Sequence, residues 1–371
     1  MTARLKEILE ILEAHYPAAW AVAGDKGGLE VGDPEAPVDL ALVALEATPA
    51  VVAEAKTRGA QLLLTHHPLL YQPLKEIRQD QPPGLMLTAL LRAGISLISC
   101  HTNLDVAPTG LNAHLARLLQ LEDIKILSET GREPYFKLSV FVPLGYEDRV
   151  RQALGDLGLG LIGRYSHCSF ASRGQGTYLP LSGARPFQGQ EGKLARASES
   201  RLEMLTPQSL LVAAITRLKE VHPYEEVAYD LYPLKNPGTP RGFGRIGDWP
   251  QPKPFPEVVA LVKELFRVET VRVWGNAPLE VQRLAVCGGS GGDLLPAALA
   301  QGAQLYVTGE VRHHQVPPGL MQLAVLEVGH FASEVVFMAP WAGRLQEIFQ
   351  QAGLTVEVAA ALAQAPPLGY L

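Results

Sequence analysis

Apolar residues recur along the chain in two spacings, which predict alternating helices and strands. Leu5, Ile8, Leu9 and Leu12 are spaced as one face of a helix. By contrast, residues 62–64 are three consecutive leucines, as in a strand of a parallel sheet that is buried on both faces. Because both spacings occur, we predict an α/β fold.

Two distant stretches of the chain align with each other without a gap. They are "VALEATPAVVAEAKTRGAQLLLT" (residues 43–65) and "VCGGSGGDLLPAALAQGAQLYVT" (residues 286–308). Each predicts a strand end, a turn, a helix, then Gly-Ala-Gln and an apolar strand that ends in threonine. Gly59 and Gly302 lie where a helix C-cap glycine is expected. The repeat predicts a duplicated α/β core of two similar lobes.

Between these stretches the pattern changes. Residues 135–234 predict strands and two helices in the order of a ferredoxin-like α+β sandwich, inserted into the core. The Pro/Gly-rich segment "KNPGTPRGFG" is typical of an exit linker. We therefore divide the chain into the first half of the core (1–130), the inserted domain (131–236) and the second half of the core (237–371).

Two adjacent histidines follow the apolar strand of the first half. His66 and His67 come directly after "QLLLT", and Pro68 follows them. Proline cannot donate to a sheet ladder and biases the preceding residue away from helix. Ligands of open α/β sheets bind at the carboxyl ends of strands. We therefore expect both imidazoles at the rim of a crevice.

A histidine also follows the next strand in each half. "CHTNLD" places Asp105 four residues after His101, and "GHFASE" places Glu334 four residues after His330. If a helix begins at each histidine, imidazole and carboxylate share one face of that helix. Alternatively, His101 is a hydrogen-bonded interior histidine, and the two acids are helix-start carboxylates favoured by the helix dipole.

Imidazoles and carboxylates are ligands of zinc, iron and manganese. This set exceeds the needs of one ion with an open position, but it would suit two ions bridged by a carboxylate. Adjacent residues of an extended chain point to opposite sides, so the paired histidines would serve different ions. The candidates are His66, His67, His101, Asp105, His330 and Glu334.

Further polar residues follow the strands of the second half. His313 and His314 would either reach the site, as acid, base or substrate binder, or lie in a surface loop. Glu310 aligns with His67 and would line the crevice. The stretch "CGGSGG" (287–292) resembles a phosphate-cradling loop, although a tight strand-to-helix turn explains it equally well.

The composition narrows the class of protein. With 371 residues, 47 % of them hydrophobic and 19 % charged, the chain is able to bury a large core. Its net charge of −6 disfavours nucleic acid, which would need a locally basic lining. Three scattered cysteines and the lack of a long apolar run predict a cytoplasmic protein that spans no membrane.

Several motifs together resemble one family, the GTP cyclohydrolase I type 2 homologues, also called Nif-three-like proteins. The resemblance covers almost the whole chain, in the long bacterial form whose insert is similar to PII and CutA proteins. One departure is "GDKGGL" (24–29), where Lys26 replaces the usual asparagine while Asp25 is kept. The motifs are "THHPLL", "HTNLD", "YSHCSF", "HPYEEVAYD", "GRIG", "VCGGSGG", "TGE" and "GHFASE".

The resemblance implies a metal site and an assembly. Two divalent cations, of zinc, iron or manganese, would be held by residues that match His66, His67, Asp105, His330 and Glu334. His101 would then lie beside the ligands or on the substrate side. The family also implies a homohexameric ring whose inserted domains trimerise.

For function, the resemblance suggests a metal-dependent hydrolase that opens the imidazole ring of GTP and releases formate. His101 or His314 would move the proton of the attacking water. The scarcity of Lys and Arg near the motifs argues against GTP itself and leaves another small-molecule or nucleotide ligand open. The alternatives are a non-catalytic regulatory or chaperone-like assembly that binds metal, and a ring that admits nucleic acid.

Overall fold

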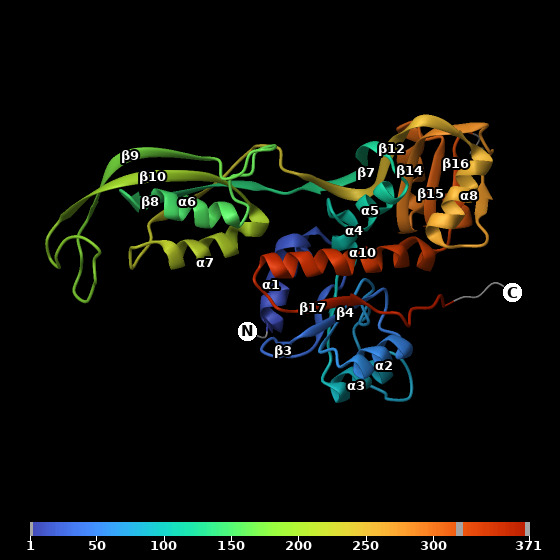
Figure 1. The fold of residues 1–371 in the computed structure, drawn as a ribbon, viewed down its shortest axis with the longest axis horizontal. Coiled ribbons are helices and arrows are strands. Elements are labelled where there is room, and N and C mark those ends of the chain that lie inside the picture. The colour runs from blue at the N-terminus through green and yellow to red at the C-terminus, as the bar shows by residue number, and fades with distance from the viewer. Residues whose placement is uncertain (1–2, 317–321, 368–371) are drawn as a thin grey trace. The chain divides into compact units, whose positions relative to one another are not determined.

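The computed structural model of the chain describes residues 3–316 and 322–367. These residues form two compact units, which we describe separately. The core unit comprises Met1–Gly131 and Pro240–Leu371, and the inserted unit comprises Arg132–Thr239. The sheets and helices of the two units confirm a mixed α/β fold (Figure 1).

The first sheet of the core unit has five strands in the order β17-β4-β5-β6-β2. Its three leucines at 62–64 are fully buried, as expected for a strand covered on both faces. Leu63 packs with α2 (Pro49–Arg58) and α3 (Gly84–Ala93), whereas Leu62 and Leu64 face the main core. The strands are β2 (Gly28–Val31), β4 (Leu40–Ala44), β5 (Leu62–Thr65), β6 (Ser96–Ser99) and β17 (Glu357–Ala360).

The second sheet has six strands in the order β13-β16-β15-β14-β12-β7. Its parallel pairing repeats that of the first sheet: Ala44 pairs with Thr65, and the aligned Cys287 pairs with Thr308. The aligned stretches therefore have equivalent places in the two sheets. The strands are β7 (Glu122–Arg132), β12 (Pro240–Pro254), β13 (Arg272–Trp274), β14 (Glu280–Ser290), β15 (Leu305–Glu310) and β16 (Ala324–Glu327).

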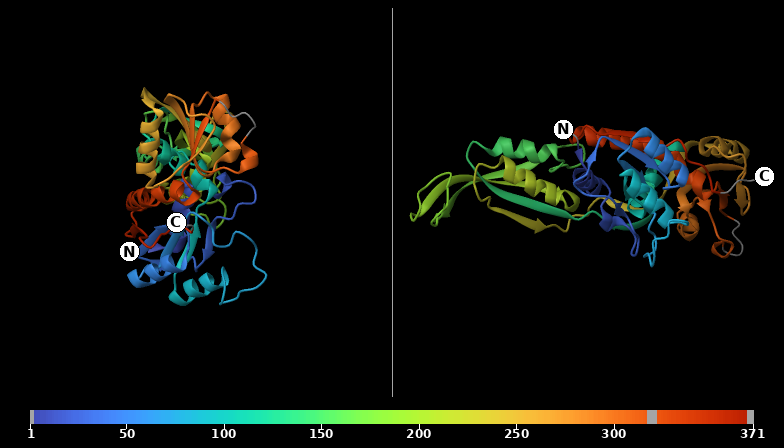
Figure 2. Two further views of the ribbon diagram at one scale, coloured as in Figure 1. Left: turned by 90° about the vertical axis from the view of Figure 1, so that its right-hand side faces the viewer. Right: turned by 90° about the horizontal axis from the view of Figure 1, so that it is seen from below.

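The two halves of the core unit exchange their last strands. Strand β17 of the second half pairs in parallel with β4, while β7 of the first half lies next to β12. Helix α10 (His330–Gln351) runs alongside both halves and buries Phe337, Trp341 and Leu345 in the main core (Figures 1 and 2). Neither half completes its sheet or its core alone.

Short helices complete the core unit. Helix α1 (Leu5–His15) buries Leu5, Ile8 and Leu12, which confirms the predicted amphipathic helix. None of the described helices is long and apolar enough to cross a membrane. The remaining elements are β1 (Ala3–Arg4), η1 (Ala18–Trp20), β3 (Pro37–Val38), α4 (Thr102–Val106), α5 (Leu111–Leu118), α8 (Phe255–Phe266), η3 (Gly292–Leu294), α9 (Leu295–Ala300) and η4 (His313–Gln315).

The inserted unit is one antiparallel sheet with two helices on one face (Figure 1). Its strands lie in the order β11-β8-β10-β9. The chain order alternates as strand, helix, strand, strand, helix, strand. The elements are β8 (Tyr135–Pro143), α6 (Glu147–Asp156), β9 (Ser169–Tyr178), β10 (Ala195–Pro207), η2 (Gln208–Leu210), α7 (Leu211–Val221) and β11 (Tyr229–Pro233).

Helix α3 offers a matched test of packing. Leu90 is fully buried against the first sheet, whereas Leu91 is 65 % exposed. We expect Leu90→Ala to lower the free energy of unfolding by about 2–5 kcal/mol, because it leaves a cavity. Leu91→Ala should change it by less than about 0.5 kcal/mol. Urea denaturation measures both, and equal losses would contradict this packing.

Candidate metal centre

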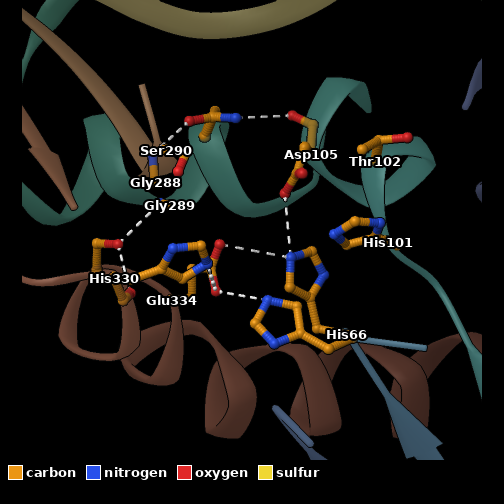
Figure 3. A network of polar contacts seen from close by, with 12 residues as sticks. His66, His101, Thr102, Asp105, Gly288, Gly289, Ser290, His330 and Glu334 are labelled. Carbon is orange, nitrogen blue, oxygen red and sulfur yellow. Dashed lines mark hydrogen bonds and ion pairs between the residues drawn. The ribbon is translucent and has the colours of Figure 1, made fainter. Parts of the chain in front are cut away.

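The predicted metal ligands converge at the carboxyl ends of β5 and β6. His66 and His67 follow β5, and His101 follows β6. Asp105 lies on α4, while His330 and Glu334 lie in the first turns of α10. Figure 3 shows His66, Asp105, His330 and Glu334 pointing toward one another. The halves of the chain thus meet at one site.

The buried carboxylate of Glu334 lies at the centre of this cluster. Its Oε1 is 3.7 Å from His66 Nε2. Its Oε2 is 3.0 Å from His67 Nε2 and 3.3 Å from His330 Nε2. On the other side of His66, Asp105 Oδ1 is 3.5 Å from the same Nε2 atom. The donor atoms therefore form two sets. One is His66 with Asp105, the other is His67 with His330, and Glu334 contributes one oxygen to each.

The paired histidines lie side by side instead of pointing to opposite sides of a strand. Their ring centroids are 5.0 Å apart. Strand β5 ends at Thr65, and the next two amides, of His66 and His67, both donate back to the β4 segment, at Ala44 and Leu45. A regular strand bonds one neighbour through alternate residues, so the alternation that we predicted does not hold here. The Nε2 atoms of the two imidazoles nevertheless face different oxygens of Glu334, Oε1 for His66 and Oε2 for His67.

The donor atoms fit a bound cation. His66 Nε2, Asp105 Oδ1 and Glu334 Oε2 are buried, and none has a hydrogen-bond partner among the described residues. Such atoms are costly inside a protein unless an ion or water satisfies them. In two groups, the nearest ligand atoms lie within 4.8 Å of one another: His66 with His67 and His101, and His67 with His330 and Glu334.

Each imidazole is oriented by a partner at Nδ1. His66 donates to the carbonyl of Cys100 over 2.9 Å, and His67 donates to Glu46 over 3.0 Å. His330 Nδ1 lies 3.2 Å from Glu310 Oε1. These contacts leave Nε2 free as the ligand atom. Glu46 is absent from our predictions, although its place just beyond β4, at the same edge of the sheet, could have indicated it.

The electrostatics of the cluster favour positive charge. Burial lowers the pKa of His67, but the close carboxylates of Glu334 and Glu46 outweigh it and raise that pKa to about 10. The close carboxylate of Glu334 raises the pKa of His330 to about 9, against the effect of burial. Burial also acts to raise the pKa of Glu334, yet the three imidazoles hold it well below its usual range. A divalent ion that binds here must displace protons.

Only one of the two predicted histidine–acid pairs forms. His330 opens α10 and faces Glu334, as expected. His101 is instead the N-cap of α4, so it does not lie on the helical face of Asp105. It contacts Asp25, whose Oδ1 is 2.8 Å from His101 Nδ1. The strand registers explain the difference. Thr65 pairs with Ser99, two residues before His101, whereas the equivalent Thr308 pairs with Glu327, three residues before His330.

Backbone contacts hold Asp105 in place. Asn112 donates to the carbonyl of Asp105 over 3.1 Å and accepts the amide of Gly288 over 3.0 Å. The buried Arg245 donates to the carbonyl of Ala107, just after α4, over 3.0 Å. These contacts tie α4 of the first half to β12 and β14 of the second half.

The glycine-rich stretch 287–292 packs the site instead of cradling a phosphate. The amides of Gly288, Gly289 and Gly291 already donate within the protein. A Cβ atom at Gly289 would overlap Glu334 Oε1. The turn-like interpretation of this stretch is therefore the better one.

The other predicted histidines lie apart from the donor sets. His313 and His314 are exposed in η4. Within residues 3–316 and 322–367, no hydrogen bond or ion pair joins His314 to the cluster. The catalytic role of His314 stays a prediction. Glu310 does lie at the site, through its contact with His330.

Fold and site together define an α/β protein with a buried histidine–carboxylate cluster suited to divalent cations. The chain matches the Duf34/NIF3 (NGG1p interacting factor 3) family over residues 3–367. It therefore belongs to that family, which confirms the resemblance seen in the motifs.

Relatives and solved structures are similar over nearly the full length. The "GTP cyclohydrolase 1 type 2 homolog" of Bacillus subtilis is 40% identical over 89% of each chain. That of Halalkalibacterium halodurans is 36% identical over 98% of each chain. The crystal structure of a Bacillus cereus protein related to NIF3 has a TM-score of 0.85 at 37% identity, with complete coverage of both chains.

Gly289 offers a test of the close packing around Glu334. Gly289 and Gly302 both have positive φ, of 61° and 75°, so Gly→Ala strains the backbone at either position. Only at Gly289 would the added methyl group collide with Glu334, because Gly302 has open space around its Cβ position. We expect Gly289→Ala to lose bound metal and Gly302→Ala to keep it. Elemental analysis of the folded variants measures this, and equal metal content would contradict the packing.

Proposed function

We propose that the protein is a hydrolase that depends on two divalent metal ions per chain. The observation that carries this proposal is the division of the Glu334 carboxylate between two donor sets. Oε1 faces His66, beside Asp105, and Oε2 faces His67 and His330. One carboxylate placed in this way is suited to bridge two ions. Zinc, iron and manganese all accept this donor chemistry.

A pair of divalent ions polarises a substrate oxygen and activates water for hydrolysis. The chain supplies a group that would move the proton. His101 donates from Nδ1 to the buried carboxylate of Asp25, which also accepts the amide and the hydroxyl of Thr102. This contact leaves His101 Nε2 as an acceptor beside the cluster. Burial acts to raise the pKa of Asp25, but these hydrogen bonds lower it, so Asp25 stays ionised.

The names of the relatives supply a candidate reaction. Because they are called homologues of GTP cyclohydrolase 1 type 2, hydrolytic opening of the GTP imidazole ring with release of formate is the first reaction to assay. In this chain, His101 would accept the proton of the attacking water. His314 would be a second proton carrier only if η4 approached the cluster.

We also propose a homohexamer in which the PII/CutA-like insert trimerises. The support is that the inserted unit exposes several large apolar side chains, which contacts between copies would cover. Its exposed members include Leu161, Tyr165, Phe170, Leu181 and Val212. Light scattering should then give six times the 40.1 kDa of one chain.

Metal content tests the two donor sets separately. We expect two ions per chain in the wild type, one in Asp105→Asn and fewer than one in Glu334→Gln, because only Glu334 belongs to both sets. Glu347→Gln, an exposed change on the same helix, should keep both ions. Elemental analysis after gel filtration measures this. A Glu334→Gln variant that retained two ions would overturn the bridging role.

Turnover tests the proton carrier. Metal-loaded protein is assayed for formate release from GTP and for hydrolysis of a panel of phosphoesters, with His66→Ala as the metal-site control. For any substrate turned over, His101→Ala and Asp25→Asn should lower kcat by about 100-fold or more while both ions stay bound. Asp39→Asn, an exposed change, should behave as wild type. Loss of an ion in His101→Ala would instead make His101 a ligand.

A further inference from the structure

A small cavity lies in front of the His67 and His330 imidazoles. Its volume is about 230 Å³, which is below the 300–1,000 Å³ that is usual for ligand pockets. The cavity is partly open to solvent, so it would enclose one group of a ligand and not a whole nucleoside triphosphate. The cavity is lined by Leu45, Glu46, His67, His330, Phe331 and Pro367.

The only charged side chain in this lining, apart from the two histidines, is a carboxylate. Glu46 uses Oε1 to hold His67, and its Oε2 has no hydrogen-bond partner among the described residues. Its side chain is 42 % exposed. Glu310 adds a second carboxylate beside His330 and is 46 % exposed. Negative charge therefore flanks both imidazoles at the point where a ligand would enter.

No lysine or arginine lines the cavity within residues 3–316 and 322–367. The cation that acts on this region is Arg312, whose charge influences Glu310. The carboxylates of Glu334 and Asp105 would partly neutralise the positive charge of two bound ions. A phosphate group beside Glu46 would thus meet repulsion without a compensating side chain.

The remaining walls are apolar. The segment that ends at Pro367 is held by Gln364, which accepts the amide of Leu45 over 2.7 Å. Glu54 accepts the amides of residues 362 and 363 from the same segment. The cavity is therefore bounded by chain that is hydrogen-bonded to α2 and to the end of β4.

We infer that the substrate group lodged beside His67 and His330 is small and uncharged or cationic, and is not a phosphate. This inference rests on the proposed function, because it concerns the ligand of the same metal centre. It assigns Glu46 as the residue that selects ligands by charge. A hydrogen-bond donor or an amine on the ligand would meet the free oxygen of Glu46.

Three hydroxamates test this selection without requiring turnover. All carry the same metal-binding head, but their tails differ: acetohydroxamate is neutral, succinic monohydroxamate is anionic and β-alanine hydroxamate is cationic. Calorimetry on metal-loaded protein should show the anionic probe binding about tenfold or more weakly than the neutral one. The cationic probe should bind at least as tightly as the neutral one.

Matched variants identify the residue responsible. Glu46→Gln keeps a similar shape and should reduce the difference between the anionic and neutral probes to about threefold or less, with the carboxylate of Glu310 remaining and metal content checked in the same samples. Glu347→Gln removes an equal charge elsewhere on the surface and should preserve the wild-type ranking. A wild-type ranking that ignores tail charge, or one that Glu46→Gln leaves unchanged, would overturn this inference alone. Failure of all three probes to bind metal-loaded protein would remove the proposed function and this inference with it.

Discussion

The structure of the site depends on one buried carboxylate that faces three imidazoles. Glu334 is buried, and its Oε2 has no hydrogen-bond partner of good geometry among the described residues. A charge in this position is tolerable only when opposite charge surrounds it. His66, His67 and His330 supply that charge when protonated, and divalent ions would supply it when bound. The first turns of α10 are therefore bound to the strand ends of the first half by electrostatics as well as by apolar packing.

The exchange of strands between the halves holds α10 in a defined position relative to the first sheet. Because β17 completes the sheet that carries His66 and His67, the chain beyond α10 is anchored in the first half. The apolar side of α10 is buried in the core common to both sheets. The helix cannot shift along its axis without breaking both attachments. The residues that would hold metal therefore lie on packed helices and strand ends.

The carboxylates that hold the histidines at Nδ1 set the chemistry of the site. Glu46, Asp25 and Glu310 each contact Nδ1 of a different histidine and so leave its Nε2 facing the cluster. The same carboxylates bring negative charge to the surroundings of the ions. Metal affinity and ligand charge preference would thus arise from the same side chains. The conflict between this acidic surrounding and a triphosphate substrate is the clearest question that the fold raises about the reaction.

The sequence by itself determined the features that depend on local pattern and on composition. Consecutive leucines indicated the buried strand β5, and the gapless repeat indicated two equivalent strand–helix–strand segments, because burial periodicity is written directly in the chain. Strand-end histidines and acids indicated six candidate residues, and the family resemblance reduced them to five candidate ligands. The tertiary structure alone decided the pairing of His101 with Asp25, the side-by-side imidazoles after β5, the exchange of β7 and β17, and the place of Glu46 in the cavity. These depend on register and on contacts between residues far apart in sequence, and no local spacing encodes such contacts.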